Sequence, residues 1–222
     1  MFANFLYYRY PQYIWAQEIN GILGSGLIRD LPSRKIVDAP CGDGIISFWV
    51  RKKHPNLNFD LYDLDESLVK RAQNNCPNTS ASVQSIFDIS LDGESNIWML
   101  INSLYCLPDK EALLNHLVGN VEYIVGVFPH TDHINYQAFL EKNPEFKNTS
   151  AMGQAATIKF FSDYGFKRIF LKDVGFIPQY ARSGFRLPWI TKRALNFVDR
   201  FYSHRKACYW LAVFEKDKNV AR

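Results

Sequence analysis

Two periodicities of apolar and polar positions alternate along most of the chain, and they predict strands separated by helices. Short apolar runs, or runs that alternate every second residue, predict strands, whereas apolar positions three and four residues apart predict amphipathic helices. The predicted strands cover 35–39, 58–63, 82–86, 97–101, 123–128, 167–174 and 207–214. The predicted helices cover 12–23, 45–51, 67–74, 110–118, 155–164 and 188–203.

Strands that alternate with helices in this way are typical of crossover units in a mainly parallel sheet. The sequence therefore predicts an α/β fold with a doubly wound, mainly parallel, seven-stranded sheet of the Rossmann-like type. We expect residues 1–222 to form a single domain with an N-terminal helical lid over 1–30 and a cofactor-binding core over 35–175. An inserted basic segment over 176–206 would carry the extra helix, and 207–216 would form the last strand.

Composition narrows the class of protein further. The 222 residues are 47% hydrophobic and 22% charged, which fits a soluble globular domain. The longest unbroken apolar run, 207–214, is much shorter than the roughly 20 residues that cross a bilayer. Residues 1–10 lack the basic and apolar regions of a signal peptide, so we expect a cytoplasmic protein. The four cysteines form no C-x-x-C pair, which favours reduced thiols and no metal site.

Positive charge is concentrated near the C-terminus. The chain carries a net charge of +4, and between 182 and 206 seven Lys or Arg residues stand against one acid. A nearly neutral body with one basic stretch argues against nucleic acid as a partner, whereas it allows weak contact with an anion or a membrane surface through 182–206. A solvated helix face is the alternative. The sequence does not indicate an oligomeric state.

The turn after the first predicted strand carries the strongest chemical signal. Ligands of doubly wound sheets bind where the first strand turns into its helix. Here that turn reads Asp38-Ala-Pro-Cys-Gly42-Asp-Gly44, and its two glycines allow a tight bend and close approach of a ligand. The second strand ends in Asp63, a carboxylate in place to accept hydrogen bonds from ribose hydroxyls, while Asp65 is the expected helix cap.

What this turn lacks indicates which cofactor it suits. It has neither the G-x-G-x-x-G pattern of dinucleotide sites nor the G-x-x-x-x-G-K-[ST] pattern of nucleoside triphosphate sites. Asp38 and Asp43 would repel phosphate groups, but they suit a cationic, phosphate-free nucleoside. The expected cofactor is therefore S-adenosylmethionine.

The same residues resemble, in order, the motifs of the class I S-adenosylmethionine-dependent methyltransferases. The glycine loop is similar to the first motif of that family, with Pro40 in place of its first glycine. The other segments that resemble family motifs are 63–72, 87–89, 97–109 and 157–165. The resemblance covers about residues 35 to 165.

The resemblance implies a set of cofactor-binding residues. Asp63 would bind the ribose, Leu64 would flank the adenine, and Asp88 would receive the adenine amino group. Tyr8 belongs to an aromatic N-terminal segment that could fold over the cofactor and stabilise its sulfonium, although ordinary packing is the alternative. The full set is Asp38, Ala39, Pro40, Gly42, Gly44, Asp63, Leu64, Asp88, Ile89, Asn102, Ser103 and Tyr8.

Residues that act on the methyl acceptor are expected after the fourth and fifth strands. His130 is the preferred general base for a hydroxyl acceptor, because imidazole titrates near neutrality. Tyr105 and His133 are further catalytic candidates. The alternatives are that these histidines are incidental, or that His130, Asp132 and His133 hold a metal; a nucleophilic role for Cys41 is a further alternative.

A small-molecule acceptor, methylated on oxygen or nitrogen, is the expected substrate, because the chain lacks the Asn-Pro-Pro-Tyr signature of amino-adenine methyltransferases. Two other functions stay open at this point. One is an enzyme of the same fold that cyclises or cleaves S-adenosylmethionine to methylthioadenosine. The other is a cofactor-binding protein without catalysis.

Overall fold

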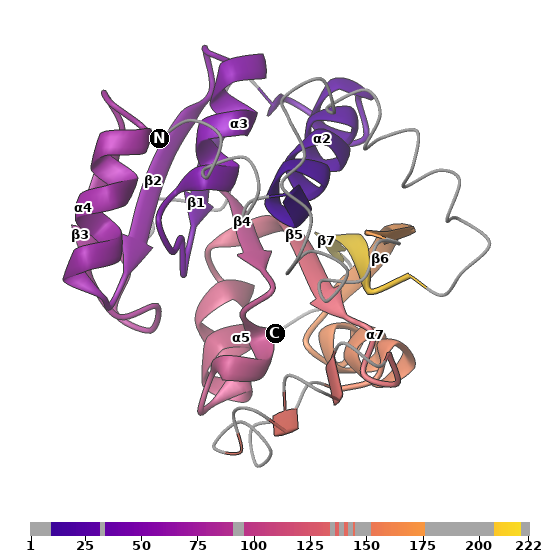
Figure 1. Ribbon diagram of the computed structural model, residues 1–222. Helices are drawn as coiled ribbons and strands as arrows, with labels where there is room; N and C mark the ends of the chain where they lie inside the picture. Colours follow the sequence, from indigo (N-terminus) through magenta and orange to yellow (C-terminus); the bar gives the residue numbers. More distant parts are fainter. Residues whose placement is uncertain are drawn as a thin grey trace.

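A computed structural model describes residues 10–31, 34–90, 96–133, 136–137, 140–141, 144, 152–175 and 207–218 (Figure 1). The helices are α2 (Tyr10–Gly24), α3 (Ile45–Lys53), α4 (Glu66–Asn75), α5 (Lys110–Val118) and α7 (Gln154–Asp163), with a short 3-10 helix η2 (Leu104–Cys106). The strands are β1 (Lys35–Asp38), β2 (Asn58–Asp63), β3 (Ser80–Val83), β4 (Asn96–Ile101), β5 (Val121–Pro129), β6 (Phe166–Val174) and β7 (Tyr209–Lys216). The expected helix 188–203, the basic segment 182–206 and Tyr8 lie outside the described residues.

The strands form one seven-stranded sheet in the order β3-β2-β1-β4-β5-β7-β6. β1 to β5 are parallel to one another, whereas β7 runs antiparallel to both β5 and β6. This arrangement confirms the predicted doubly wound, mainly parallel α/β sheet. The carboxyl ends of the parallel strands therefore meet at one edge of the sheet, and the antiparallel β7 begins at that same edge.

Side chains of the central strands alternate between two apolar layers, as the twofold period of a strand requires. In β4, Ile97 and Met99 face the layer that contains α2, α3 and part of α4, whereas Trp98 and Leu100 face the layer that contains α5 and α7. Figure 1 shows these two groups of helices on opposite sides of the sheet. No helix among the described residues is long and apolar enough to cross a membrane.

Three strands differ from the prediction by two or more residues at an end. β3 begins at Ser80 rather than at 82, because its polar sequence is held by pairing with β2 and not by its own apolar pattern. β5 is longer than predicted at both ends, since Val121 pairs with Asn96 of β4 and Pro129 pairs with Tyr209 of β7. β7 begins at Tyr209, two residues later than predicted, and extends to Lys216.

The described part of the N-terminal segment packs on the sheet. The ring of Trp15 meets that of Tyr209 edge-on at 4.8 Å, and Tyr13 meets Trp49 of α3 at 5.2 Å. Glu18 forms an ion pair with Lys172 of β6 at 2.6 Å. For the aromatic side chains of α2, the structure thus shows the packing role that the sequence left as an alternative.

Aromatic rings fill the second layer beneath β5 and β7. The Phe128 ring stacks on Trp210 at 4.4 Å, and Phe161 stacks on Phe214 at 4.3 Å. A Cβ atom added at Gly126 would lie 2.2 Å from Cζ of Phe128. The Phe128 ring is held between neighbouring rings, so it has little freedom to move away.

We expect Gly126→Ala to lower the free energy of unfolding by about 1–3 kcal/mol, because the added methyl group overpacks a closed aromatic layer. Urea denaturation measures this change. Gly21→Ala is the matched control: Gly21 lies within α2, and a Cβ atom there would meet nothing within 4 Å. Alanine favours helix, so this control should be neutral or more stable by up to about 1 kcal/mol. Equal urea midpoints for the two variants would contradict this interpretation.

Candidate functional site

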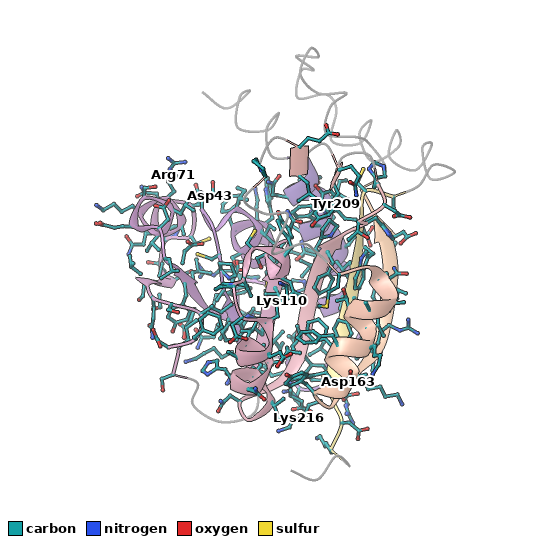
Figure 2. All side chains as sticks on the ribbon, turned by 90° about the horizontal axis from the view of Figure 1, so that it is seen from below. Asp43, Arg71, Lys110, Asp163, Tyr209 and Lys216 are labelled. Atoms are coloured by element: carbon teal, nitrogen blue, oxygen red, sulfur yellow. The ribbon has the colours of Figure 1, made fainter. Side chains whose placement is uncertain are left out.

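The predicted site residues that lie among the described residues follow the carboxyl ends of β1 to β5. Figure 2 shows Asp43 of the glycine loop and Tyr209 at the start of β7 toward this edge, whereas Lys216 lies at the opposite end of β7. The residues brought to this edge are Asp38, Ala39, Pro40, Gly42, Gly44, Asp63, Leu64, Asp88, Ile89, Asn102, Ser103, Tyr105, His130 and His133. Parallel strand pairing thus gathers residues that are up to 95 positions apart, from Asp38 to His133.

The two glycines of the loop after β1 have different roles. Both have positive φ angles, 55° at Gly42 and 69° at Gly44, a conformation that favours glycine. A Cβ atom on Gly44 would lie 2.9 Å from Cβ of Ala72, so this glycine lets the loop pack directly on α4. A Cβ atom on Gly42 would meet nothing within 4 Å. Gly42 therefore leaves its backbone open to an approaching ligand.

Asp63, at the end of β2, faces the glycine loop. Its Oδ2 accepts a hydrogen bond from the Gly42 amide at 2.8 Å, and its Oδ1 accepts one from the Asp65 amide at 3.0 Å. Asp65 caps α4 by accepting from Ser67 and Leu68, as the sequence predicts. A carboxylate has about four acceptor positions, so Asp63 can still accept hydrogen bonds from ligand hydroxyls. The next residue, Leu64, is 70% exposed and presents an apolar surface beside this carboxylate.

Asp38 is the buried carboxyl group of the site. It is only 2% exposed, and its Oδ2 accepts a hydrogen bond from Ser47 Oγ at 2.6 Å. Its pKa is raised to about 7, chiefly because burial disfavours the charged form; the Ser47 hydrogen bond lowers the pKa, and the nearby Asp63 raises it. A cationic ligand group close to Asp38 would favour the ionised form. The loop can therefore bind positive charge.

Asp88 and Ile89 follow β3 and differ in exposure. Asp88 is exposed, and its carbonyl oxygen accepts a hydrogen bond from Gln84 Nε2 at 2.6 Å. The Ile89 side chain is only 1% exposed and packs in the layer that contains α5 and α7. Any contact of Ile89 with a ligand must therefore come from its backbone, and its cofactor role stays a prediction.

The end of β4 turns sharply into the 3-10 helix η2. Asn102 has a positive φ of 51°, and its amide donates to the Val127 carbonyl of β5 at 2.7 Å. Ser103 is buried, and its Oγ has no hydrogen-bond partner among the described residues. Burial raises the pKa of the Tyr105 phenol, whose ring meets Tyr136 edge-on at 6.0 Å. At neutral pH, Tyr105 is therefore a hydrogen-bond donor rather than a base.

His130 follows β5 and contacts a carboxylate from another strand. Its Nε2 lies 3.0 Å from Oδ1 of Asp173 in β6, a partner that the sequence analysis missed. The His130 amide donates to the Cys208 carbonyl at 3.0 Å. His133 is buried behind it, with Nε2 at 3.7 Å from Cys208 Sγ and its amide bonded to the His130 carbonyl. His133 thus holds the turn that carries His130.

The structure also bears on the alternatives for Cys41 and for a metal. The Cys41 thiol donates to the Gly42 carbonyl at 3.3 Å, and burial together with the charge of Asp38 raises its pKa. It therefore stays a thiol at neutral pH, which disfavours the nucleophilic role. Within the ranges that the structure describes, no three His, Cys, Asp or Glu side chains are grouped so that they could hold a metal ion.

Protein stability should report the raised pKa of Asp38. Because its pKa is about 7 in the folded protein and 3.8 in an ordinary carboxyl group, the folded state binds the extra proton between these values. Its contribution to stability is complete below about pH 4 and is lost as the pH rises towards 7. Asp38→Asn keeps a hydrogen-bond acceptor for Ser47, but the asparagine does not ionise, so the variant does not lose this stability as the pH rises. We therefore compare the free energy of unfolding of the variant with that of the wild type by urea denaturation. The difference should favour the variant by about 1–4 kcal/mol more at pH 8 than at pH 4. A difference that is independent of pH would contradict the assignment.

Comparisons with known proteins agree with this architecture. Residues 22–97 match the family model described as methyltransferase small domain. The protein 235L of Invertebrate iridescent virus 6, described as a methyltransferase, is 25% identical over 123 residues, which are 52% of this chain and 45% of that relative. The match therefore spans less than half of the length of the viral protein.

Solved structures share the fold over most of the chain. The plantazolicin methyltransferase BpumL in complex with SAH has a TM-score of 0.64 at 13% identity, covering 95% of this chain and 88% of that one. The geranyl diphosphate C-methyltransferase of Streptomyces coelicolor A3(2), in complex with Mg²⁺, geranyl diphosphate and S-adenosyl-L-homocysteine, has a TM-score of 0.63 at 13% identity, with coverages of 90% and 80%. Sheet order and these matches together show that the chain has the Rossmann-like fold of the class I S-adenosylmethionine-dependent methyltransferases.

Proposed function

We propose that this chain transfers the methyl group of S-adenosylmethionine to an oxygen or nitrogen atom of a small molecule, with His130 as the proton acceptor. The observation that carries the proposal is the position of His130 at the edge that also holds the glycine loop. Only β4 separates β5 from β1, so at about 4.8 Å per strand the ends of β5 and β1 are roughly 10 Å apart. This separation suits a cofactor site beside an acceptor site.

The residues around the glycine loop fit the expected cofactor. Gly42 offers an open backbone, Asp63 has free acceptor positions for ribose hydroxyls, and Leu64 exposes an apolar side chain beside them. Asp38 supplies negative charge when a cationic group favours its ionised form. S-adenosylmethionine supplies an electrophilic methyl group, whose bond to sulfur breaks with both electrons left on sulfur as the acceptor atom bonds to the carbon.

On the acceptor side, the chain provides a base and hydrogen-bond donors. His130 takes the proton from the acceptor O–H or N–H group and later releases it to water. The protonated Tyr105 phenol and the Ser103 hydroxyl can donate hydrogen bonds that orient the acceptor. His133 supports His130 from behind rather than acting on the acceptor.

The acceptor itself is not fixed by the fold. Most structural neighbours are small-molecule methyltransferases, and the two named above act on different acceptors. A shared sheet order therefore supports the cofactor and the reaction class more strongly than it supports any one acceptor. This proposal for the class of acceptor depends on the His130 base, since an acceptor that must lose a proton needs one.

Calorimetric titration of the purified chain with S-adenosylmethionine and S-adenosylhomocysteine is the first test, followed by mass spectrometry of turnover products with a panel of small hydroxyl and amine compounds. Binding of both ligands and formation of S-adenosylhomocysteine with a methylated product would support the proposal. Formation of methylthioadenosine in the absence of any acceptor would contradict the proposal and indicate that the chain cleaves the cofactor. Failure of the folded chain to bind either ligand would overturn it.

Asp63→Asn should weaken S-adenosylhomocysteine binding by about 10- to 150-fold, which corresponds to roughly 1.5–3 kcal/mol for hydrogen bonds to a charged acceptor. The same titration measures it. Asp60→Asn is the matched control, because Asp60 lies on the same strand but pairs with Lys35 at 3.1 Å near the start of β1. Equal affinities for the two variants would show that Asp63 does not bind the cofactor.

His130→Gln should lower the rate of methyl transfer by about 10²- to 10⁴-fold, because the base is lost, while the affinity for S-adenosylhomocysteine stays unchanged. Single-turnover assays with the acceptor from the panel measure the rate. His54→Gln serves as the control, since His54 follows α3 and precedes β2 at the opposite edge of the sheet. A normal rate in His130→Gln would show that the acceptor does not need this base.

A further inference from the structure

Strand β6 contains an irregularity that decides where Asp173 points. In the pairing with β7, Arg168 lies opposite Phe214 and Phe170 lies opposite Val213, so one extra residue, Ile169, is inserted into β6. Such a bulge shifts the alternation of side chains by one position for the rest of the strand. Bulges are common next to functional sites, where they redirect a side chain.

The residues on either side of the bulge show this shift. Phe166, before the bulge, packs in the layer that contains α5 and α7. Asp173 is seven positions later, and in a regular strand it would face the opposite layer. After the bulge, Asp173 instead lies opposite Trp210, a residue of the same layer as Phe166. Directly paired residues of antiparallel strands share a face, so Asp173 lies on the α5 and α7 side.

His130 reaches the same side through β5. Phe128 belongs to the α5 and α7 layer, and twofold alternation continued past the end of β5 at Pro129 would place His130 on the same side. The two side chains meet there, with His130 Nε2 at 3.0 Å from Asp173 Oδ1. Lys172 points to the other face, where it pairs with Glu18 of α2. The bulge therefore gives β6 two contacts that a regular strand could not make together with the buried Phe166.

The contact with Asp173 also distinguishes the two ring nitrogens of His130. A carboxylate only accepts hydrogen bonds, so Nε2 of the neutral imidazole carries the proton and donates it to Asp173. Nδ1 then holds the lone pair, and it has no hydrogen-bond partner among the described residues. The carboxylate also stabilises the imidazolium that forms when Nδ1 takes up a proton.

We propose that Asp173 is a positioning residue for His130, which it holds in the Nε2–H tautomer so that Nδ1 receives the proton of the methyl acceptor. This inference rests on the proposed function, in which His130 is the base. The proton moves from the acceptor O–H or N–H group to Nδ1, and the acceptor electron pair forms the new bond to the methyl carbon. Asp173 keeps the Nε2 proton throughout and undergoes no net change.

Other charged or titratable groups lie near His130 and Asp173, and the test must distinguish their effects from the effect of this pair. Asp132 and His133 belong to the same turn as His130, and Cys208 and Tyr209 approach from β7. A change in overall pH dependence could come from any of them. The test therefore observes the His130 ring directly.

Nuclear magnetic resonance of the ¹⁵N-labelled chain of 222 residues provides that observation, with His130→Gln used to assign the ring signals. The wild type should show a His130 ring N–H proton bonded to Nε2, because the carboxylate protects it from exchange with water. Asp173→Ala should lose this signal. Asp163→Ala is the matched control and should keep it: Asp163 and Asp173 side chains are equally exposed, at 53%, and Asp163 pairs with Lys159 on α7 (Figure 2).

A wild-type proton on Nδ1, no protected ring signal, or a Nε2–H signal that survives in Asp173→Ala would each overturn the inference. Calorimetry with S-adenosylhomocysteine separates it from the proposed function: the affinity of Asp173→Ala should stay within about twofold of the wild type, as expected for a residue outside the cofactor loop. Absence of binding in the wild type would instead overturn the proposed function. With an acceptor from the panel, Asp173→Ala should lower kcat by about 10- to 100-fold with little change in the KM for S-adenosylmethionine.

Discussion

The antiparallel pairing of β5 with β7 is the constraint on which the proposed acceptor side of the site depends. Residues Tyr123 to Pro129 pair in unbroken register with Tyr209 to Glu215, and both strands are almost completely buried. Their common end places His130 beside Cys208, while β6 on the far side of β7 brings Asp173 to the same edge. The aromatic rings packed beneath this pair resist a change of register, because any slip would reverse the face of every side chain.

The cofactor side depends on a different kind of constraint, which is close backbone packing around buried charge. Gly44 lets the loop touch Ala72 of α4, and the amide of Gly42 is bonded to Asp63. Asp38 is buried a few residues away, where desolvation opposes its negative charge. A cationic ligand would relieve this cost. A loop that buries a carboxyl group in this way is thus less stable without a cationic ligand, which is common at functional sites.

Much of the cofactor side could be predicted from the sequence. The strands 35–39 and 97–101 have strong apolar patterns, and the structure contains both as β1 and β4. The glycine loop and Asp63 are separated by one helix and one strand, so their meeting follows from the local order of elements. β3 was predicted less well: its Ser80–Val83 sequence is half polar, and only its pairing with β2 determines where it begins.

On the proposed acceptor side, one contact could not be predicted from the sequence alone. The fold class, the edge at which ligands bind and the candidates His130 and Asp63 were determined by periodicity, order and spacing, all of which are local. The partner of His130 was decided by tertiary structure, because Asp173 is 43 residues away and faces His130 only after the bulge at Ile169. A bulge is a property of two paired strands, since the extra residue exists only relative to its partner. No pattern within β6 itself could therefore have indicated this contact.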